Sequence, residues 1–172
     1  MNSANFENVK KGKKLTHIDT SGNPQMVDVS AKTATKRTAR AQAIVWVGKE
    51  IVQLIKNEEL ATKKGPVFQT AILAGVMGAK KTADLIPLAH PIGIEDCKLI
   101  IRNTADSIII ESAVSIRSKT GVEMEALTAV SIAALTVYDM CKALSHNLII
   151  KEIRLLEKTG GKKDFKHNAS AG

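Results

Sequence analysis

Asp139 and Lys142 are three residues apart in a segment whose pattern predicts a long helix. Side chains at this spacing lie on one face of a helix. A carboxylate beside an ammonium group can act as an acid–base pair, in which Lys142 keeps Asp139 ionised and can itself donate a proton. The same spacing is typical of an exposed ion pair that contributes less than ~1 kcal/mol. Spacing alone favours the ion pair.

Two more carboxylates, Glu123 and Glu125, lie at the start of the same segment. Thr120 and Glu123 fit the capping-box pattern, with Thr120 as the N-cap, so a structural role is favoured for Glu123. Glu125 and Asp139 point within about 40° of each other, but they are roughly 21 Å apart along the helix axis. One small substrate does not readily reach both on one helix. If both are catalytic, two copies of the chain build the site, as in an isologous dimer.

His90 stands between Ala89 and Pro91. A residue before proline is held in an extended conformation, so the direction of its side chain is well defined. A loop histidine is most often structural, and the functional alternative is a proton carrier or a phosphate ligand near neutral pH. The other three histidines show no metal-ligand spacing, which argues against a tight zinc site.

Basic residues outnumber acidic ones by 25 to 17, which gives a net charge of +8. This balance favours polyanionic partners, although scarce aromatic residues weaken the case for single-stranded nucleic acid. Most lysines are expected to be solvated side chains, but two clusters lie in segments whose sequence predicts a defined local structure. Lys63-Lys64-Gly65-Pro66 lies on a predicted turn before a helix, and the glycines of segment 158–163 allow a backbone nest for anions. The spacing in segment 158–163 is not that of a P-loop.

The predicted elements define an α+β fold. Alternating or apolar runs predict strands, and apolar or small residues at helical spacing predict helices. The strands are expected over 39–47, 96–103, 107–117 and 148–156, and the helices over 49–58, 67–86 and 121–145. The apolar stripe of the last helix is expected at positions 124, 127, 131, 134, 138 and 141. This order predicts a ferredoxin-like split βαβ arrangement, an antiparallel sheet with helices packed on one face.

The chain of 172 residues is long enough for one domain, expected over 15–165. A flexible basic arm (1–14) and a flexible tail (166–172) are expected at its ends. The two cysteines form no disulfide framework, which favours a reducing compartment. There is no apolar signal core, and the longest uncharged stretches are shorter than the ~18 residues that a membrane span needs. We therefore expect a cytoplasmic protein without membrane contact.

Seven stretches of the chain resemble the MoaC family, the cyclic pyranopterin monophosphate synthases of molybdenum cofactor biosynthesis. The most specific are the Gly-Val-Glu-Met-Glu-Ala block at 121–126 and the Tyr-Asp-Met-Cys-Lys block at 138–142. The full set comprises segments 15–19, 26–32, 64–68, 79–91, 119–128, 137–143 and 154–162. The resemblance thus covers nearly the whole predicted domain.

The resemblance implies a lyase that converts (8S)-3′,8-cyclo-7,8-dihydroguanosine 5′-triphosphate into cyclic pyranopterin monophosphate and diphosphate. It also implies a homohexamer of three dimers with sites at the dimer interfaces. By matching position, Asp139 is the expected catalytic acid/base, with Lys142 beside it. The residues expected to contact substrate or lie near it are Leu88, Ala89, His90, Met124, Glu125, Glu123, Lys64, Lys80, Arg37 and Lys158.

These residue types suit the implied chemistry. A triphosphate carries a charge of about −4, and lysines both attract it and stabilise the departing diphosphate. Carboxylate, imidazole and ammonium groups cover the proton transfers without a redox cofactor, and Mg²⁺ on the substrate phosphates is chemically reasonable. Two positions depart from the family pattern. Ala89 stands where the family usually has Cys, and Ile72 stands where many relatives have Arg.

Two other functions remain open at this point. The first is an RNA-binding module, motivated by the basic pI and the order of elements. The predicted hairpin over 96–117 contains no aromatic residue, and such modules use aromatic side chains there. The second is a non-catalytic subunit that only binds a nucleotide. Substitution of Asp139 or Lys142 by alanine distinguishes this subunit from an enzyme.

Overall fold

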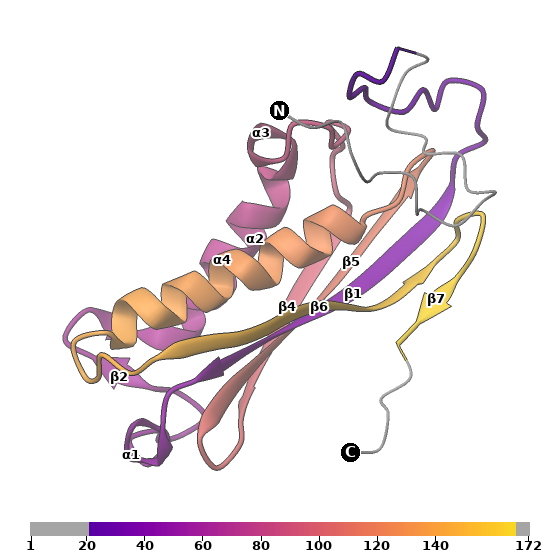
Figure 1. Ribbon diagram of the computed structural model, residues 1–172. Helices are drawn as coiled ribbons and strands as arrows, with labels where there is room; N and C mark the ends of the chain where they lie inside the picture. The colour runs from indigo at the N-terminus through magenta and orange to yellow at the C-terminus, as the bar shows by residue number, and fades with distance from the viewer. Residues whose placement is uncertain (1–20, 168–172) are drawn as a thin grey trace.

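The computed structural model describes residues 21–167, and within them the chain forms a five-stranded antiparallel sheet covered by helices on one face, together with a separate two-stranded sheet (Figure 1). The sheet has the strand order β4-β5-β1-β6-β7. Its strands are β1 (Thr35–Trp46), β4 (Asp96–Asn103), β5 (Ser107–Ser118), β6 (Ile149–Thr159) and β7 (Phe165–Lys166). Helices α2 (Val67–Lys80) and α4 (Glu123–Cys141) lie on one face. The ferredoxin-like α+β prediction is confirmed.

Shorter elements connect these parts. They are α1 (Lys49–Val52), β2 (Ala61–Thr62), β3 (Gly65–Pro66) and α3 (Thr82–Leu85). The predicted arm at 1–14 lies outside the described residues, as does most of the predicted tail. Lys166, the first residue of the predicted tail, belongs to β7, and the backbone N–H of His167 donates to the carbonyl of Leu156 at 2.7 Å.

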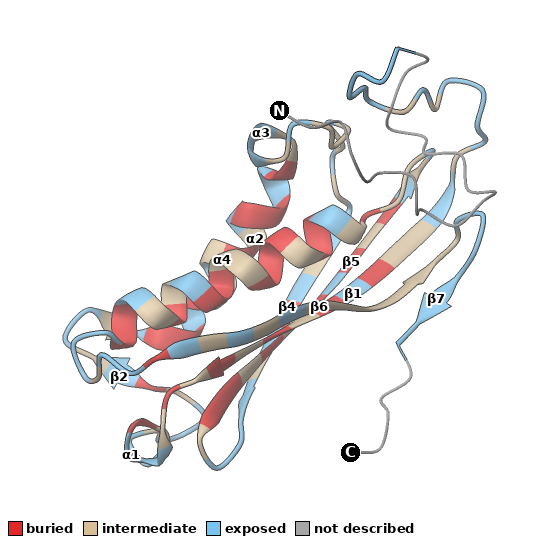
Figure 2. Ribbon diagram, viewed as in Figure 1, coloured by how far each residue is buried: buried red, intermediate tan, exposed pale blue. Residues whose placement is uncertain are grey.

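Small side chains bring the helical layer close to the sheet. In β1 every second residue from Ala39 to Val45 is buried and faces the helices, as expected for a strand covered on one face. Alanines of α4, including Ala126, Ala129 and Ala133, are fully buried in this helical layer, and Figure 2 shows buried segments along both the helices and the strands. The buried Ser112 of β5 donates to the carbonyl of Ala126 at 2.8 Å. The start of α4 is thereby tied to the sheet.

Glycines allow α2 and α4 to pack closely. A Cβ on Gly75 would lie 2.9 Å from the carbonyl oxygen of Ala129, and one on Gly78 would lie 2.7 Å from Cγ1 of Ile132. Real Cβ atoms do not approach other atoms so closely, so both positions need glycine. The predicted close packing of this helix is confirmed, but its predicted extent to residue 86 is wrong. The helix ends at Lys80, and α3 follows after Lys81.

Several details of the predicted helices are also wrong. The segment 49–58 forms helix only over α1, and the chain then turns, with positive φ angles at Asn57 and Glu58. The expected capping box at Thr120 does not form. The N-cap of α4 is Val122, with no side-chain capping bond among the described residues, and the helix ends at Cys141 rather than near 145.

The predicted apolar stripe of α4 is confirmed only in part, since Leu127 and Tyr138 are partly buried against the core and Ala134 and Cys141 lie within it. The buried apolar residues of α4 are at positions 126, 129, 130, 133, 134, 137, 140 and 141. Of the predicted positions only Ala134 and Cys141 are buried, and Met124 is 39 % exposed. The helix is apolar on more than one side, so its sequence does not define a unique buried face.

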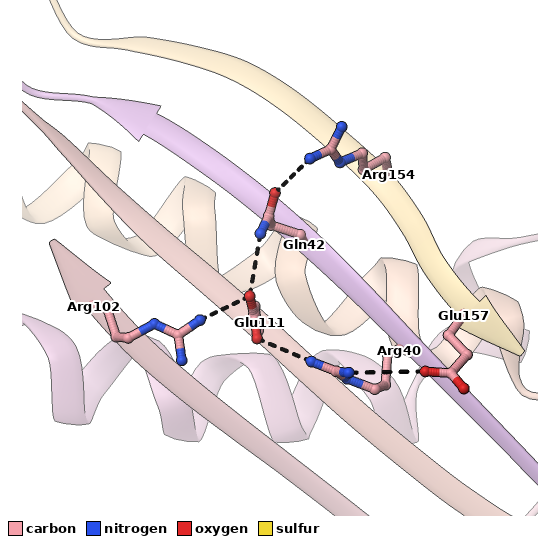
Figure 3. Close-up of polar contacts among 6 residues, drawn as sticks. All are labelled: Arg40, Gln42, Arg102, Glu111, Arg154 and Glu157. Carbon is pink, nitrogen blue, oxygen red and sulfur yellow. Dashed lines mark hydrogen bonds and ion pairs between the residues drawn. The ribbon is translucent and has the colours of Figure 1, made fainter. Parts of the chain in front are cut away.

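Charged side chains cover the face of the sheet opposite the helices (Figure 3). Glu111 lies at their centre and accepts hydrogen bonds from Arg102 at 2.8 Å, Gln42 at 3.2 Å and Arg40 at 3.3 Å. Arg154 donates to Gln42 at 3.2 Å, and Arg40 lies 3.8 Å from Glu157. These basic residues of β1, β4 and β6 are therefore engaged in cross-strand pairs.

Candidate functional site

A cavity opens at the N-terminal end of α4. It has a volume of about 360 Å³ and lies between this helix end, the loop before β4 and the segment before β1. The predicted residues that line it are Leu88, Ala89, His90, Glu123, Met124 and Glu125. These six positions come from two distant segments of the sequence, and the fold brings them together.

Two smaller hollows adjoin this cavity and extend it in two directions. One, of about 270 Å³, shares His90 and Glu125 with the cavity and adds Lys80. The other, of about 210 Å³, shares Glu123 and adds Arg37 and Lys158. We call the three hollows together the groove. It has cationic side chains at both ends and carboxylates in the middle, which suits an elongated anion with titratable groups.

Glu125 is the most buried charged side chain of the groove, with 4 % of its surface exposed. Burial raises its pKa above the ordinary 4.5, and the nearby charge of Glu123 acts in the same direction, whereas His90 opposes it. A carboxyl group with a raised pKa holds its proton at higher pH than usual and can donate it. Nε2 of His90 lies 2.7 Å from the carbonyl oxygen of Val27, which can only accept, so Nε2 carries a proton in this bond.

Ion pairs and hydrogen bonds hold Lys158 and Arg37 at the end of the groove opposite Lys80. Nζ of Lys158 lies 2.7 Å from Oε1 of Glu123, which gives Glu123 a partner that the capping-box prediction missed. Nε of Arg37 donates to the carbonyl of Ser118 at 3.3 Å. In the predicted anion nest after β6, the N–H of Gly160 already donates to Asp164 at 3.0 Å. This N–H is satisfied by a carboxylate of the same chain, which weakens the nest prediction.

A second charged cluster lies at the C-terminal end of α4. Oδ1 of Asp139 lies 2.8 Å from Nζ of Lys142, and Oδ2 lies 2.7 Å from Nζ of Lys64. Lys64 also donates to the backbone carbonyl of Asp139 at 2.9 Å. Hydrogen bonds from Lys142 and then Lys64 lower the pKa of Asp139 to about 2, and Asp139 in turn raises the pKa of Lys142. The predicted Asp139–Lys142 pair is present, and Lys64 is its third member.

The predicted site residues therefore fall into two groups within one chain. The groove collects Arg37, Lys80, Leu88, Ala89, His90, Glu123, Met124, Glu125 and Lys158, and the cluster at the other helix end collects Lys64, Asp139 and Lys142. Glu125 and Asp139 belong to one continuous helix and are separated by roughly 21 Å along its axis. One chain does not bring the two groups into contact with a single small molecule.

Sequence reasoning missed some residues of the groove. Lys32 lines it beside Glu123, and Val27 holds His90. The segment that carries them is fastened by Lys119, which donates to the carbonyl of Ser30 at 2.6 Å. Segment 26–32 is one of the stretches that resemble the MoaC family. That resemblance is the signal that could have placed these residues in the site.

Two further observations concern α4 and metal ligands. α4 is long and apolar enough to cross a membrane by length and composition, with a mean hydropathy of 1.3, but 56 % of that window is buried inside the protein. This is the pattern of a core helix. Within residues 21–167 no group of three or more His, Cys, Asp or Glu side chains is placed to hold a metal ion.

The fold and the groove define a ferredoxin-like α+β protein with a groove at the N-terminal end of its core helix that carries both cationic and carboxylate side chains. The model of the MoaC family matches residues 26–161. The chain belongs to the MoaC family.

Several curated proteins are similar to this chain. Molybdenum cofactor biosynthesis protein 1 of Drosophila melanogaster is 54 % identical over 153 residues, which cover 88 % of this chain and 27 % of that protein. The molybdenum cofactor biosynthesis bifunctional protein of Synechocystis is 52 % identical over 155 residues, or 87 % of this chain and 45 % of that protein. This chain thus spans less than half the length of these two relatives.

A third relative is similar in length. The cyclic pyranopterin monophosphate synthase of Streptomyces avermitilis is 50 % identical over 149 residues, which cover 87 % of this chain and 86 % of that protein.

Proposed function

We propose that this chain is a cyclic pyranopterin monophosphate synthase of molybdenum cofactor biosynthesis. It converts (8S)-3′,8-cyclo-7,8-dihydroguanosine 5′-triphosphate into cyclic pyranopterin monophosphate and releases diphosphate. Membership of the MoaC family and the similarity to a synthase along nearly its whole length support this activity. The observation that carries it is the pairing of a cationic groove with a separate carboxylate–ammonium cluster on the same helix.

The groove has the groups to bind and protonate such a substrate. Arg37 and Lys158 attract the triphosphate and stabilise the charge of the departing diphosphate. Glu125, with its raised pKa, and His90 supply and accept protons as the rings open and close. No redox cofactor is needed. Mg²⁺ on the substrate phosphates would neutralise part of their charge.

Asp139 and Lys142 are the proposed acid–base pair. With its pKa at about 2, Asp139 is ionised at neutral pH and can accept a proton. Lys142 remains charged and can donate one. A sugar hydroxyl must lose its proton before it attacks the α-phosphorus, and Asp139 is the proposed acceptor of that proton. Lys64 keeps its contact with Oδ2 of Asp139 and so holds the carboxylate in place during the transfer.

A second copy of the chain completes the site in this proposal. An antiparallel pair of α4 helices with its two-fold axis near residue 132 places Glu125 of one copy beside Asp139 of the other. Support comes from the outer surface of the helical layer, where Leu73 is 67 %, Met77 61 % and Leu135 55 % exposed. Exposed apolar side chains of this kind mark interaction surfaces. Three such dimers form the proposed homohexamer, and the proposed location is the cytoplasm.

The activity is tested by incubating the purified chain with the cyclic guanosine triphosphate substrate and analysing the products by mass spectrometry. Formation of cyclic pyranopterin monophosphate and diphosphate is expected. Unchanged substrate would refute the proposal. The Asp139→Ala and Lys142→Ala variants then separate catalysis from mere binding, because loss of turnover with retained ligand binding is expected only of an enzyme.

An RNA-binding role has no comparable support. The hairpin of β4 and β5 has no aromatic side chain to stack on a base. On the open face of the sheet, Glu111 and its partners form ion pairs instead (Figure 3).

A further inference from the structure

The side chain of Glu59 accepts three backbone hydrogen bonds. Its Oε1 receives the N–H groups of Leu60 at 2.8 Å and Phe68 at 2.7 Å, and its Oε2 receives the N–H of Gln69 at 3.1 Å. Phe68 and Gln69 belong to the first turn of α2, where unpaired N–H groups need partners. The N-cap of this helix, Pro66, makes no side-chain capping bond among the described residues. Glu59 therefore caps α2 from outside the helix, with a charge that suits the helix dipole.

The chain between Glu59 and α2 forms the small hairpin that carries Lys64. Ala61–Thr62 pairs with Gly65–Pro66, which leaves Lys63 and Lys64 at the tip. The base of the hairpin is closed by the N–H of Val67, which donates to the carbonyl of Leu60 at 2.9 Å. Leu60 and Val67 are both fully buried. The direction of the hairpin thus depends on the contacts at its base, and the carboxylate of Glu59 supplies three of them.

The tip of this hairpin reaches the far end of α4. Nζ of Lys64 lies 2.7 Å from Oδ2 of Asp139 and 2.9 Å from its backbone carbonyl. We propose that Glu59 is a positioning residue that acts through Lys64, because it fastens the base of the hairpin to α2 and so holds the ammonium group at Asp139. The effect on turnover rests on the proposed function, in which Asp139 takes part in the reaction.

The test is a double-mutant cycle on the full-length chain. Glu59→Gln keeps the shape of the side chain but replaces one accepting oxygen by an NH₂ group that faces backbone N–H donors. The four proteins are the wild type, Glu59→Gln, Lys64→Ala and the double variant, each assayed for kcat and KM with the cyclic guanosine triphosphate substrate. Glu58→Gln is the matched control, since Glu58 is exposed and, among residues 21–167, its carboxylate makes none of these capping bonds.

We expect Glu59→Gln to lower kcat by about tenfold in the wild-type background and by less than about twofold in the Lys64→Ala background, because residues that act through one another are not additive. Glu58→Gln should leave kcat unchanged. An equal loss from Glu59→Gln in both backgrounds would overturn the proposal, since a merely structural role lowers activity whether or not Lys64 is present. Where Lys64→Ala lowers kcat, an unchanged kcat in Glu59→Gln would also overturn it.

A structure of the Glu59→Gln variant separates this inference from the proposed function. The Lys64 Nζ to Asp139 Oδ2 distance should exceed hydrogen-bonding range, about 3.5 Å. If Lys64→Ala retains full turnover, the proposed role of Lys64 in catalysis is wrong, and the structure alone decides the positioning role. A Lys64–Asp139 contact that persists in Glu59→Gln would refute that role whatever the activity.

Discussion

Removal of Lys142 should slow the reaction without changing the charge of Asp139. Lys142 donates to Oδ1 of Asp139 at 2.8 Å, and its hydrogen bond is the main cause of the low pKa of that carboxyl. In Lys142→Met the pKa should rise from about 2 toward the ordinary 3.8, since Lys64 still contacts the other oxygen. If Lys142 donates a proton in the reaction, kcat should fall by about 10²- to 10⁴-fold.

The pKa values determine how this loss depends on pH. At pH 7 the protonated fraction of Asp139 is about 0.001 % for a pKa of 2 and about 0.06 % for a pKa of 3.8. Asp139 is therefore ionised in both proteins throughout the neutral range. The ratio of variant to wild-type kcat should stay constant between pH 6 and 8.

The assay is kcat against pH by mass analysis of the product, with Lys98→Met as the control. Lys98 is an exposed lysine on the opposite face of the sheet, and its loss should have no effect on turnover. Recovery of Lys142→Met activity at higher pH would refute the reasoning, because it would mean that Lys142 acts by keeping Asp139 ionised. A loss of less than about tenfold would refute the role of proton donor.

Two further predictions concern stability. Because burial raises the pKa of Glu125 above 4.5, the native chain binds more protons than the unfolded chain between pH 4.5 and that raised value, and stability falls as pH rises through this window. Glu125→Gln should thus melt at a higher temperature than the wild type at pH 7 and at the same temperature below pH 4. Its turnover should be lost. An equal shift of the melting temperature at both pH values would contradict this. Gly78→Ala should lower the free energy of unfolding in urea by about 1–2 kcal/mol, because overpacking against Ile132 outweighs the better helix propensity of alanine. Gly93→Ala, where a Cβ meets no described atom within 4 Å, is the control and should show no such loss.

The fold could be predicted from the sequence where the periodicity of apolar residues is strong and fits a single buried face. The alternation of side chains in β1 and the two Ile- and Val-rich runs of the β4–β5 hairpin predict strands, and these strands form the sheet. The buried face of α4 could not be predicted in this way, because exposed Met124 and Leu135 are as apolar as the core residues. Their exposure in one chain is understandable if a second copy covers them, which is information that the local pattern does not contain.

The contacts of the candidate site could be predicted where both residues lie on one helix, but not where they come from distant segments. The contact between Asp139 and Lys142 follows from helix geometry alone. The pairs Lys158–Glu123 and Lys64–Asp139 join segments that are 35 and 75 residues apart, so only the tertiary structure or a family resemblance can reveal them. The hairpin that carries Lys64 has strands of two residues, too short for any periodic signal.

The shared site is tested most directly by mixing two inactive variants. Glu125→Gln and Asp139→Asn chains are co-expressed in equal amounts, and the turnover of the mixed assembly is compared with that of each variant alone and of the wild type. If each site takes Glu125 from one copy and Asp139 from the other, about 25 % of the sites contain neither substitution, so about a quarter of wild-type activity should return. If each site lies within one chain, every site carries a substitution, and activity no higher than that of the separate variants would contradict the shared site.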